Sequence, residues 1–432
     1  MNTPAVPSTV AVEPTPKSPP VRKSRPRPRP RRVVTLIYWV AVLTLVGVNV
    51  WSYRRDAREV PATAIIEGWI RQGRYEDAHS ELAERLRRHP HDVEAMVLDA
   101  RALAGKGDYL ACAGRLHATP DWWPAKRELL LREGEAYLEL GLAVKAEKAW
   151  LAAVKDDPLH PLPPNLLADA VISSMLNIYT IEERYEDAHK LIWEAYKQSP
   201  GPDRARLLEM RVHGELERPA PSATLPRLRQ FVAADPDDWE AARALARAEY
   251  SAGNYEFAAI LLAERLKERP DEPRLWHDWL WLLHQRGDKA ELLAAAESAP
   301  AAAESVADVW NYRGQARLNR GEFDAAGDAF RRAIEIEPNT PEYHYRLAML
   351  ARRLGRTAEA AEHAAIRKRL DENRAKLRTS FGEYESALLD APGAPKLENA
   401  VLDLANICRD LGFKRTAAAW LSLKPNDFRA GR

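Results

Sequence analysis

The sequence predicts an all-α fold: an α-α superhelix of about nine to ten helix–turn–helix units, preceded by one N-terminal transmembrane helix. Three observations predict this class. Glycines recur every 34 residues, prolines recur with the same period, and 21 consecutive residues near the N-terminus carry no charge. The 432 residues are 46% hydrophobic and 29% charged, which is a globular balance. Two cysteines exclude a disulfide scaffold and a multi-cysteine zinc site.

The first segment, 1–32, is a basic, proline-rich tail. Its eight Lys or Arg residues and single acid, Glu13, contribute +7 to a net charge of +1, so the remaining chain sums to −6. Proline fixes φ and removes a backbone donor, which predicts a disordered or polyproline-like tail. Attraction to anionic lipid is its favoured role, and a protein partner that reads Pro/Arg stretches is the alternative. Nucleic-acid binding is disfavoured because no aromatic residue interleaves the arginines.

The uncharged stretch, 33–53, is predicted to be a transmembrane helix. Twenty-one helical residues span about 31 Å, the thickness of the hydrocarbon core of a bilayer. Seven basic residues lie within fifteen residues on its N-terminal side and three on its C-terminal side. The positive-inside rule therefore places the tail in the cytoplasm and the repeats outside it, in the periplasm if the chain is bacterial. A cleaved signal peptide and a buried soluble helix are the alternatives.

Glycines and prolines at a 34-residue spacing divide the rest of the chain into repeating units. Glycine tolerates positive φ and therefore fits the turn inside each unit, while proline ends the second helix and opens the next unit. Each amphipathic pair cannot bury its apolar face alone, so units are expected to stack on their neighbours, with small residues such as Ala146, Ala258 and Ala326 at close contacts. The periodic residues are Gly73, Gly107, Gly141, Gly253, Gly287, Gly321 and Gly355, with Pro90, Pro124, Pro158, Pro236 and Pro270.

On this pattern the chain resembles the tetratricopeptide repeat (TPR) family, whose units are helix–turn–helix pairs with set small and aromatic positions. The matches in unit 307–340 are Trp310, Gly314, Gly321, Phe323, Ala326, Phe330, Ala333 and Pro338. Unit 127–160 matches with Leu130, Gly134, Tyr137, Ala146, Trp150, Ala153 and Pro158. Unit 169–202 matches with Leu176, Tyr179, Tyr185, Ala188, Ala195 and Pro200. The resemblance implies a TPR solenoid with a long concave surface.

The predicted organisation follows from this register. The segments are a tail (1–32), a transmembrane helix (33–53), TPR repeats 1–3 (59–160), a Pro-rich insertion (161–168), TPR repeats 4–9 (169–374), a helical extension and loop (375–397), and a degenerate capping repeat (398–425). One unit, 205–238, departs from the pattern because Pro219 and Pro221 lie in its turn.

Signatures of catalysis are absent from the sequence. The glycines punctuate helix pairs rather than cradle phosphate, and no G-x-S-x-G elbow or H-E-x-x-H helix occurs. No catalytic residue, cofactor or metal ligand is therefore assigned, and the chain is expected not to be an enzyme. Cys112 and Cys408 are expected to be buried, unpaired thiols.

Binding is the remaining function. In TPR proteins, set positions of each first helix face the concave groove, and the resemblance transfers them to ten residues here. These are Arg243, Arg247, Tyr250, Arg274, His277, Trp281, His284, Asn311, Gln315 and Tyr345. The set is basic and aromatic, which suits acidic or aromatic segments of a protein or peptide partner. For Trp281, groove and core remain open alternatives.

The sequence therefore predicts a membrane-anchored scaffold or adaptor that binds protein partners in a TPR groove, in a role such as cell-envelope assembly. The alternative is an accessory subunit that delivers substrate to a membrane enzyme complex. Joint replacement of Arg243, Arg247 and Trp281 is expected to weaken partner capture without unfolding the solenoid.

Overall fold

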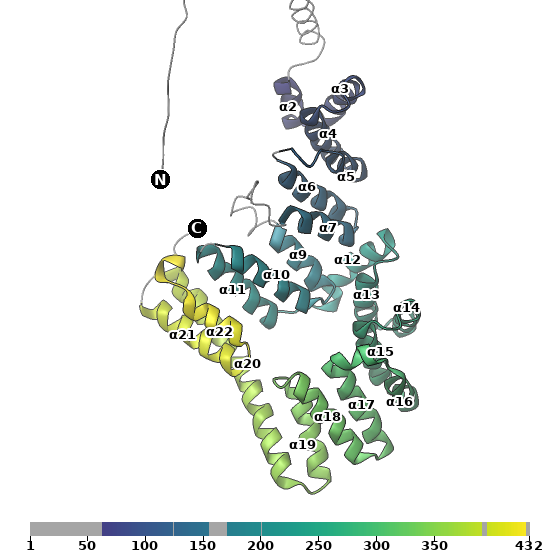
Figure 1. Ribbon diagram of the computed structural model, residues 1–432, viewed down its shortest axis with the longest axis vertical. Coiled ribbons are helices and arrows are strands. Elements are labelled where there is room, and N and C mark those ends of the chain that lie inside the picture. Colours follow the sequence, from purple (N-terminus) through teal and green to yellow (C-terminus); the bar gives the residue numbers. More distant parts are fainter. Residues whose placement is uncertain (1–62, 124, 155–170, 200, 391–394, 429–432) are drawn as a thin grey trace, which may run out of the picture. The chain divides into compact units, whose positions relative to one another are not determined.

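The computed structural model describes residues 63–123, 125–154, 171–199, 201–390 and 395–428, and every regular element in these ranges is a helix (Figure 1). This agrees with the predicted all-α class. None of the helices in those ranges is both long and apolar enough to cross a bilayer. The predicted tail 1–32, transmembrane helix 33–53 and insertion 161–168 lie outside the described residues.

The N-terminal repeats form three helix pairs in the predicted register. The helices are α2 (Thr63–Arg71), α3 (Tyr75–Arg88), α4 (Val93–Gly105), α5 (Tyr109–His117), α6 (Lys126–Glu139) and α7 (Ala143–Val154). Their internal turns pass through Gly73, Gly107 and Gly141, whose φ values are 77°, 78° and 80°. The periodic glycines are therefore required by a backbone conformation that L side chains rarely adopt.

The next described stretch holds one further pair and then two helices that separate. The pair is α9 (Ile172–Ile181) with α10 (Tyr185–Gln198), followed by α11 (Gly201–Leu216) and α12 (Pro221–Ala234). Within the predicted unit 205–238 both helices form, but α11 packs against α10, whereas α12 packs against α13 (Trp239–Ser251) and α9. The prolines account for this departure, because Pro219 and Pro221 cannot continue a helix and extend the connection.

Regular stacking resumes from α13 onward. The helices are α13 with α14 (Tyr255–Glu268), α15 (Pro273–Arg286) with α16 (Lys289–Ser298), α17 (Ala307–Arg320) with α18 (Phe323–Ile336), and α19 (Pro341–Arg353) with α20 (Thr357–Asp390). A short 3₁₀ segment, η2 (Ala301–Ser305), follows α16 where Pro300 ends the helix. Each first helix packs on the second helix of the preceding pair.

Small residues let the helices of a pair approach closely, as expected. Ala146, Ala258 and Ala326 are fully buried. A methyl group added at Gly314 would overlap the ring of Phe330, and one at Gly134 would overlap Trp150. These glycines are therefore selected by packing, since their backbone is ordinary helix.

The C-terminal segment ends the stack in a different way. Helix α20 is continuous through Asp390, with its first half beside α19 and its second half beside α21 (Pro395–Asp410) and α22 (Lys414–Ser422), as Figure 1 shows. The segment η3 (Pro425–Phe428) follows and packs on α11. The predicted extension and capping repeat thus correspond to the end of α20 and to the pair α21–α22.

Units far apart in the sequence also pack against each other, contrary to the prediction that each unit stacks only on its neighbours. Leu208 and Val212 of α11 share a buried cluster with Leu404 and Trp420 of the C-terminal helices. Tyr384 donates a hydrogen bond of 2.6 Å to the Glu209 carboxylate. Helix α11, released from α12 by the proline-rich connection, therefore packs against the C-terminal pair.

Both cysteines are buried and unpaired, as the sequence predicts. Cys112 lies in α5 and Cys408 in α21, and burial raises the pKa of each thiol to about 11. At neutral pH they are therefore protonated thiols that act as small apolar side chains.

Candidate binding cleft

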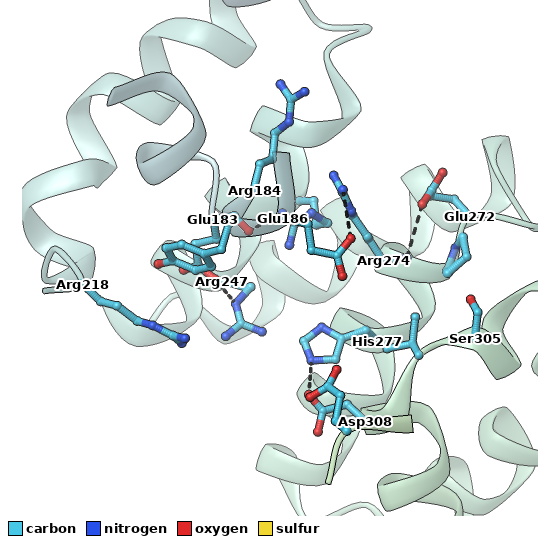
Figure 2. A pocket seen from close by; sticks show the side chains of 15 residues that line it. Glu183, Arg184, Glu186, Arg218, Arg247, Glu272, Arg274, His277, Ser305 and Asp308 are labelled. Atoms are coloured by element: carbon cyan, nitrogen blue, oxygen red, sulfur yellow. Dashed lines mark hydrogen bonds and ion pairs between the residues drawn. The ribbon is translucent and has the colours of Figure 1, made fainter. Parts of the chain in front are cut away.

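A cleft of about 610 Å³ opens where the turn between α9 and α10 faces the first helices α13, α15 and α17 (Figure 2). Four predicted groove residues line it. These are Arg243, Arg247, Arg274 and His277. The other lining residues are Glu183, Arg184, Tyr185, Glu186, Arg218, Glu272, Pro273, Ser305, Val306, Asp308 and Glu337.

Three of the lining residues bond to one buried carboxylate, Asp278, which is 0% exposed. It accepts hydrogen bonds from Arg243 Nη1 at 2.8 Å, from Arg247 Nη1 at 2.9 Å and from His277 Nδ1 at 2.7 Å. Burial alone would raise the pKa of Asp278, but Arg243, Arg247 and His277 hold it far below its ordinary value. Asp278 is therefore ionised and joins α13 to α15.

Arg243 is a structural cation rather than an exposed ligand. It is 4% exposed and donates through Nη2 to the carbonyl of Glu182 at 2.7 Å, besides its bond to Asp278. Its Nε also pairs with Glu240 at 3.2 Å. A single side chain thus connects α13, α15 and the turn after α9.

That turn is unusual at Glu183, which has φ 54° and is the described non-glycine residue with positive φ. Glu183 occupies the position that holds glycine in the regular units, such as Gly321 in unit 307–340. The left-handed conformation costs a residue with a Cβ about 1–2 kcal/mol. The ion pair between Glu183 Oε2 and Arg247 Nε, 2.8 Å apart, helps to offset this cost.

A second ion-pair cluster fixes the start of α10. Arg274 Nη1 lies 3.1 Å from Asp187 and 2.6 Å from Glu240, and Arg184 also pairs with Asp187, at 3.0 Å. Burial would raise the pKa of Asp187, but Arg274 and Arg184 lower it to about 2. Burial and the neighbouring Asp238 raise the pKa of Glu182 to about 8, so it is largely protonated at neutral pH.

His277 is held between two carboxylates. Its Nδ1 lies 2.7 Å from Asp278 and its Nε2 lies 3.1 Å from Asp308, which also accepts from Tyr343 at 2.9 Å. Ionised carboxylates only accept, so both ring nitrogens carry protons. Burial opposes this charge, but Asp278 and Asp308 outweigh it and raise the pKa of His277 to about 9.

The positive charge predicted for the groove is thus largely neutralised by carboxylates of the same chain. Arg243, Arg247, Arg274 and His277 all form ion pairs with the chain's own carboxylates. The exposed charges at the edge are Arg218, whose guanidinium lies 4.6 Å from the centre of the Tyr185 ring, and the carboxylates of Glu186 and Glu337. Figure 2 shows Arg218 entering from the side opposite Glu272 and Ser305.

The remaining six predicted residues lie elsewhere. Trp281 packs on the core with Tyr250, its ring centre 5.0 Å away, and also supports Arg247, whose guanidinium lies 4.5 Å above it. His284 contacts the ring of Tyr312, and Tyr345 lies under Arg367 in a different hollow. Asn311 and Gln315 are buried, at 3% and 5% exposure.

Sequence reasoning did not identify the carboxylates that pair with the cleft cations, among them Asp278 and Asp187. Asp278 stands in the apolar stretch of α15, and Asp187 belongs to the string YEDAH that also occurs at 75–79. Two signals could have indicated them: a lone acid at a buried helical phase, and the missing turn glycine at Glu183. Within the described ranges, no group of His, Cys, Asp and Glu side chains is arranged to hold a metal ion.

Comparisons with known proteins identify the repeats directly. A tetratricopeptide repeat model matches residues 307–340, the limits of the predicted unit, and a second such model matches residues 70–111 and 222–273. No curated protein matches the sequence. These matches confirm the TPR resemblance in three stretches of the chain.

Solved structures that resemble parts of this chain include several of MamA. MamA 41-end from Desulfovibrio magneticus RS-1 is 23% identical, with 39% of this chain and 96% of that chain covered and a TM-score of 0.31. A MamA RS-1 ArsTM double mutant is 23% identical, with 40% and 97% covered and a TM-score of 0.31. MamA MSR-1 is 23% identical, with 39% and 95% covered and a TM-score of 0.30.

The burial of Arg243 revises the expectation that its replacement leaves the solenoid folded. Arg243→Met is expected to lower the free energy of unfolding by about 3–5 kcal/mol, because it leaves Asp278 under-compensated and the Glu182 carbonyl without its donor. The matched control, Arg218→Met at the exposed cleft edge, should change it by less than about 0.5 kcal/mol. Urea denaturation measures both. Equal stability of the two variants would contradict the structural role.

The His277 network predicts a pH-dependent stability. Its pKa is about 9 in the folded chain and about 6.5 when unfolded, so its protonation stabilises the fold fully below pH 6.5 and is lost as the pH rises through 9. The stability difference between wild type and His277→Asn should therefore shrink by roughly 2–4 kcal/mol between pH 6 and pH 9.5. Denaturation at both pH values tests this, and a difference that does not change with pH would refute it.

Proposed function

We propose that this chain is a non-enzymatic, membrane-anchored scaffold that holds a segment of a protein partner in the cleft between the α9–α10 turn and helices α13, α15 and α17. TPR units in three stretches support a protein–protein interaction scaffold. The observation that carries the proposal is the open cleft of about 610 Å³, whose walls are fixed by buried ion pairs. A preformed cleft lowers the ordering cost of binding.

The edge of the cleft indicates how a partner would be held. Arg218 stacked on Tyr185 offers a cation and an aromatic face for an acidic or aromatic side chain, although neither residue was among the predicted groove residues. Glu186, next to Tyr185 in α10, and Glu337, at the end of α18, offer exposed carboxylates that line the cleft. The paired cations, Arg243 and Arg274, position the walls and are not the primary ligands.

The membrane part of the proposal rests on sequence. Residues 33–53 anchor the chain, the basic tail 1–32 lies in the cytoplasm against anionic lipid, and the repeats lie outside, in the periplasm if the chain is bacterial. A scaffold in that place would gather partners at the membrane surface, as cell-envelope assembly requires.

Partner capture tests the cleft. Arg218→Glu combined with Tyr185→Ala should reduce crosslinked partner by tenfold or more, because it reverses the exposed charge and removes the aromatic face. Crosslinking in cells followed by mass spectrometry measures this. The control, Arg369→Glu on the exposed face of α20, should leave capture unchanged. Undiminished capture by the cleft variant would refute the site, and a stoichiometric enzyme among the partners would favour the accessory-subunit alternative.

Reporter fusions test the topology. A fusion after residue 200 should be active for a reporter that works only outside the cytoplasm and silent for one that works only inside. A fusion before residue 33 should give the reverse pattern. Cytoplasmic activity of the fusion after residue 200 would overturn the orientation while leaving the cleft proposal standing.

A further inference from the structure

A regular unit offers a slot between its two helices, and the first helix of the next unit fills it. In unit 307–340 the filling helix is α19. Its Tyr343, Leu347 and Leu350 are buried against α17 and α18, in clusters that contain Ala326, Phe330 and Ala333. The occupant of this slot is therefore an amphipathic helix with large apolar residues at positions i, i+4 and i+7.

The next slot, between α19 and the first half of α20, is left open. Helix α20 does not turn back after one unit but continues through Asp390. Helix α21 packs instead in the cluster that contains Leu370, Leu377 and Phe381. Among the described residues, α19 packs substantially only against α18 and α20. No following helix of these ranges covers the slot.

The open slot is a hollow of about 350 Å³. Its uncharged lining residues are Tyr345, Ala348, Met349 and Ala364. Ala348 and Ala364 stand 34 residues after Gly314 and Phe330, so the aromatic ring that fills the preceding unit has no counterpart here. Met349 is 43% exposed, whereas its counterpart Gln315 is 5% exposed under a completed stack. The missing volume is that of one large apolar side chain.

The rim of the slot is charged where the preceding slot is apolar. Arg367 and Lys368 replace Ala333 and Ile334, and they pair along α20 with Asp371 at 3.5 Å and Glu372 at 3.8 Å. Arg352 extends from α19 over the Met349 sulfur, 3.7 Å from Sδ, and no carboxylate in the described part of the chain pairs with it. The long charged side chains cover part of the apolar surface of the slot while their charged ends stay in water. Arg352 is the cation of this set that has no carboxylate partner among the described residues.

We propose that this slot binds an amphipathic helix of a protein partner, which continues the stack in place of the missing first helix. Its apolar residues at i, i+4 and i+7 cover Met349 and Ala364, with one large side chain in the hollow. An acidic residue faces Arg352. Such a helix would extend the interface between α19 and the preceding unit, and its acidic residue would pair with the surplus cation. The site is separate from the cleft at α13 and α15.

The probe for this site is a helix that fills such a slot already. A fluorescent, amidated peptide with the sequence of residues 341–354 supplies the three apolar positions, and its own Arg352 and Arg353 are replaced by Glu to face the cation of the slot. The full chain should bind this peptide, measured by fluorescence anisotropy. The peptide with unmodified arginines should bind severalfold more weakly.

Matched variants of the full chain assign the binding. Met349→Arg should weaken peptide binding at least tenfold, and Arg352→Glu should reverse the preference between the two peptides. Leu402→Arg on α21, an exposed apolar residue at 47% against 43% for Met349, should have no effect. The cleft variant Arg218→Glu should also bind the peptide normally, which separates this site from the proposed function.

Three results would overturn the proposal. They are no peptide binding at 1 mM, binding that Met349→Arg leaves intact, and equal affinity for the acidic and basic peptides. Sedimentation of the full chain tests a different occupant. Self-association that Met349→Arg abolishes would assign the slot to a second copy instead of a partner helix.

Discussion

The second half of this chain depends on one carboxylate, Asp278. A buried charge is tolerated only when it is fully paired, and Asp278 is paired by Arg243, Arg247 and His277. Each of these cations makes a further bond to another element, so the carboxylate connects the first helices of three units to the turn after α9. Regular apolar stacking builds the solenoid, but this network holds the cleft open.

The same network explains why side chains predicted to bind a partner are not free to do so. Family positions on a first helix indicate which face a residue occupies, and Arg243, Arg247, Arg274 and His277 do meet at one cleft. Their charges are satisfied by Asp278, Asp187, Glu240 and Asp308, which come from distant stretches of sequence. A position on a helix is a local property, whereas an ion pair across 31 or 35 residues depends on tertiary packing. Sequence reasoning therefore selected four side chains that line one cleft, but it did not predict the carboxylates that pair with them.

Prediction of the fold succeeded where the determinants are local and failed where they are not. Turn glycines such as Gly141 and Gly321 require positive φ, and prolines end helices, so helix pairs follow directly from spacing. The separation of α11 from α12 and the packing of α11 against the C-terminal helices depend on which apolar faces meet after the chain has folded. The missing glycine at position 183 could have been noticed in the sequence. A residue with a Cβ at positive φ is strained, and here an ion pair between Glu183 and Arg247 helps to offset the strain.

The two candidate sites illustrate opposite ways in which a repeat protein can form a binding surface. At the cleft, the chain has inserted its own turn against α13 and α15, and ion pairs hold the cleft walls in place. At the slot, the repeat pattern continues in α19 and α20 but the next helix is missing, and small residues leave the space that a ring occupies one unit earlier. A network saturated with ion pairs leaves the exposed charges, such as Arg218 and Glu337, at the edges of the cleft. An incomplete stack indicates the form of the proposed partner more closely, because the filled slot of unit 307–340 shows a helix surface that fits.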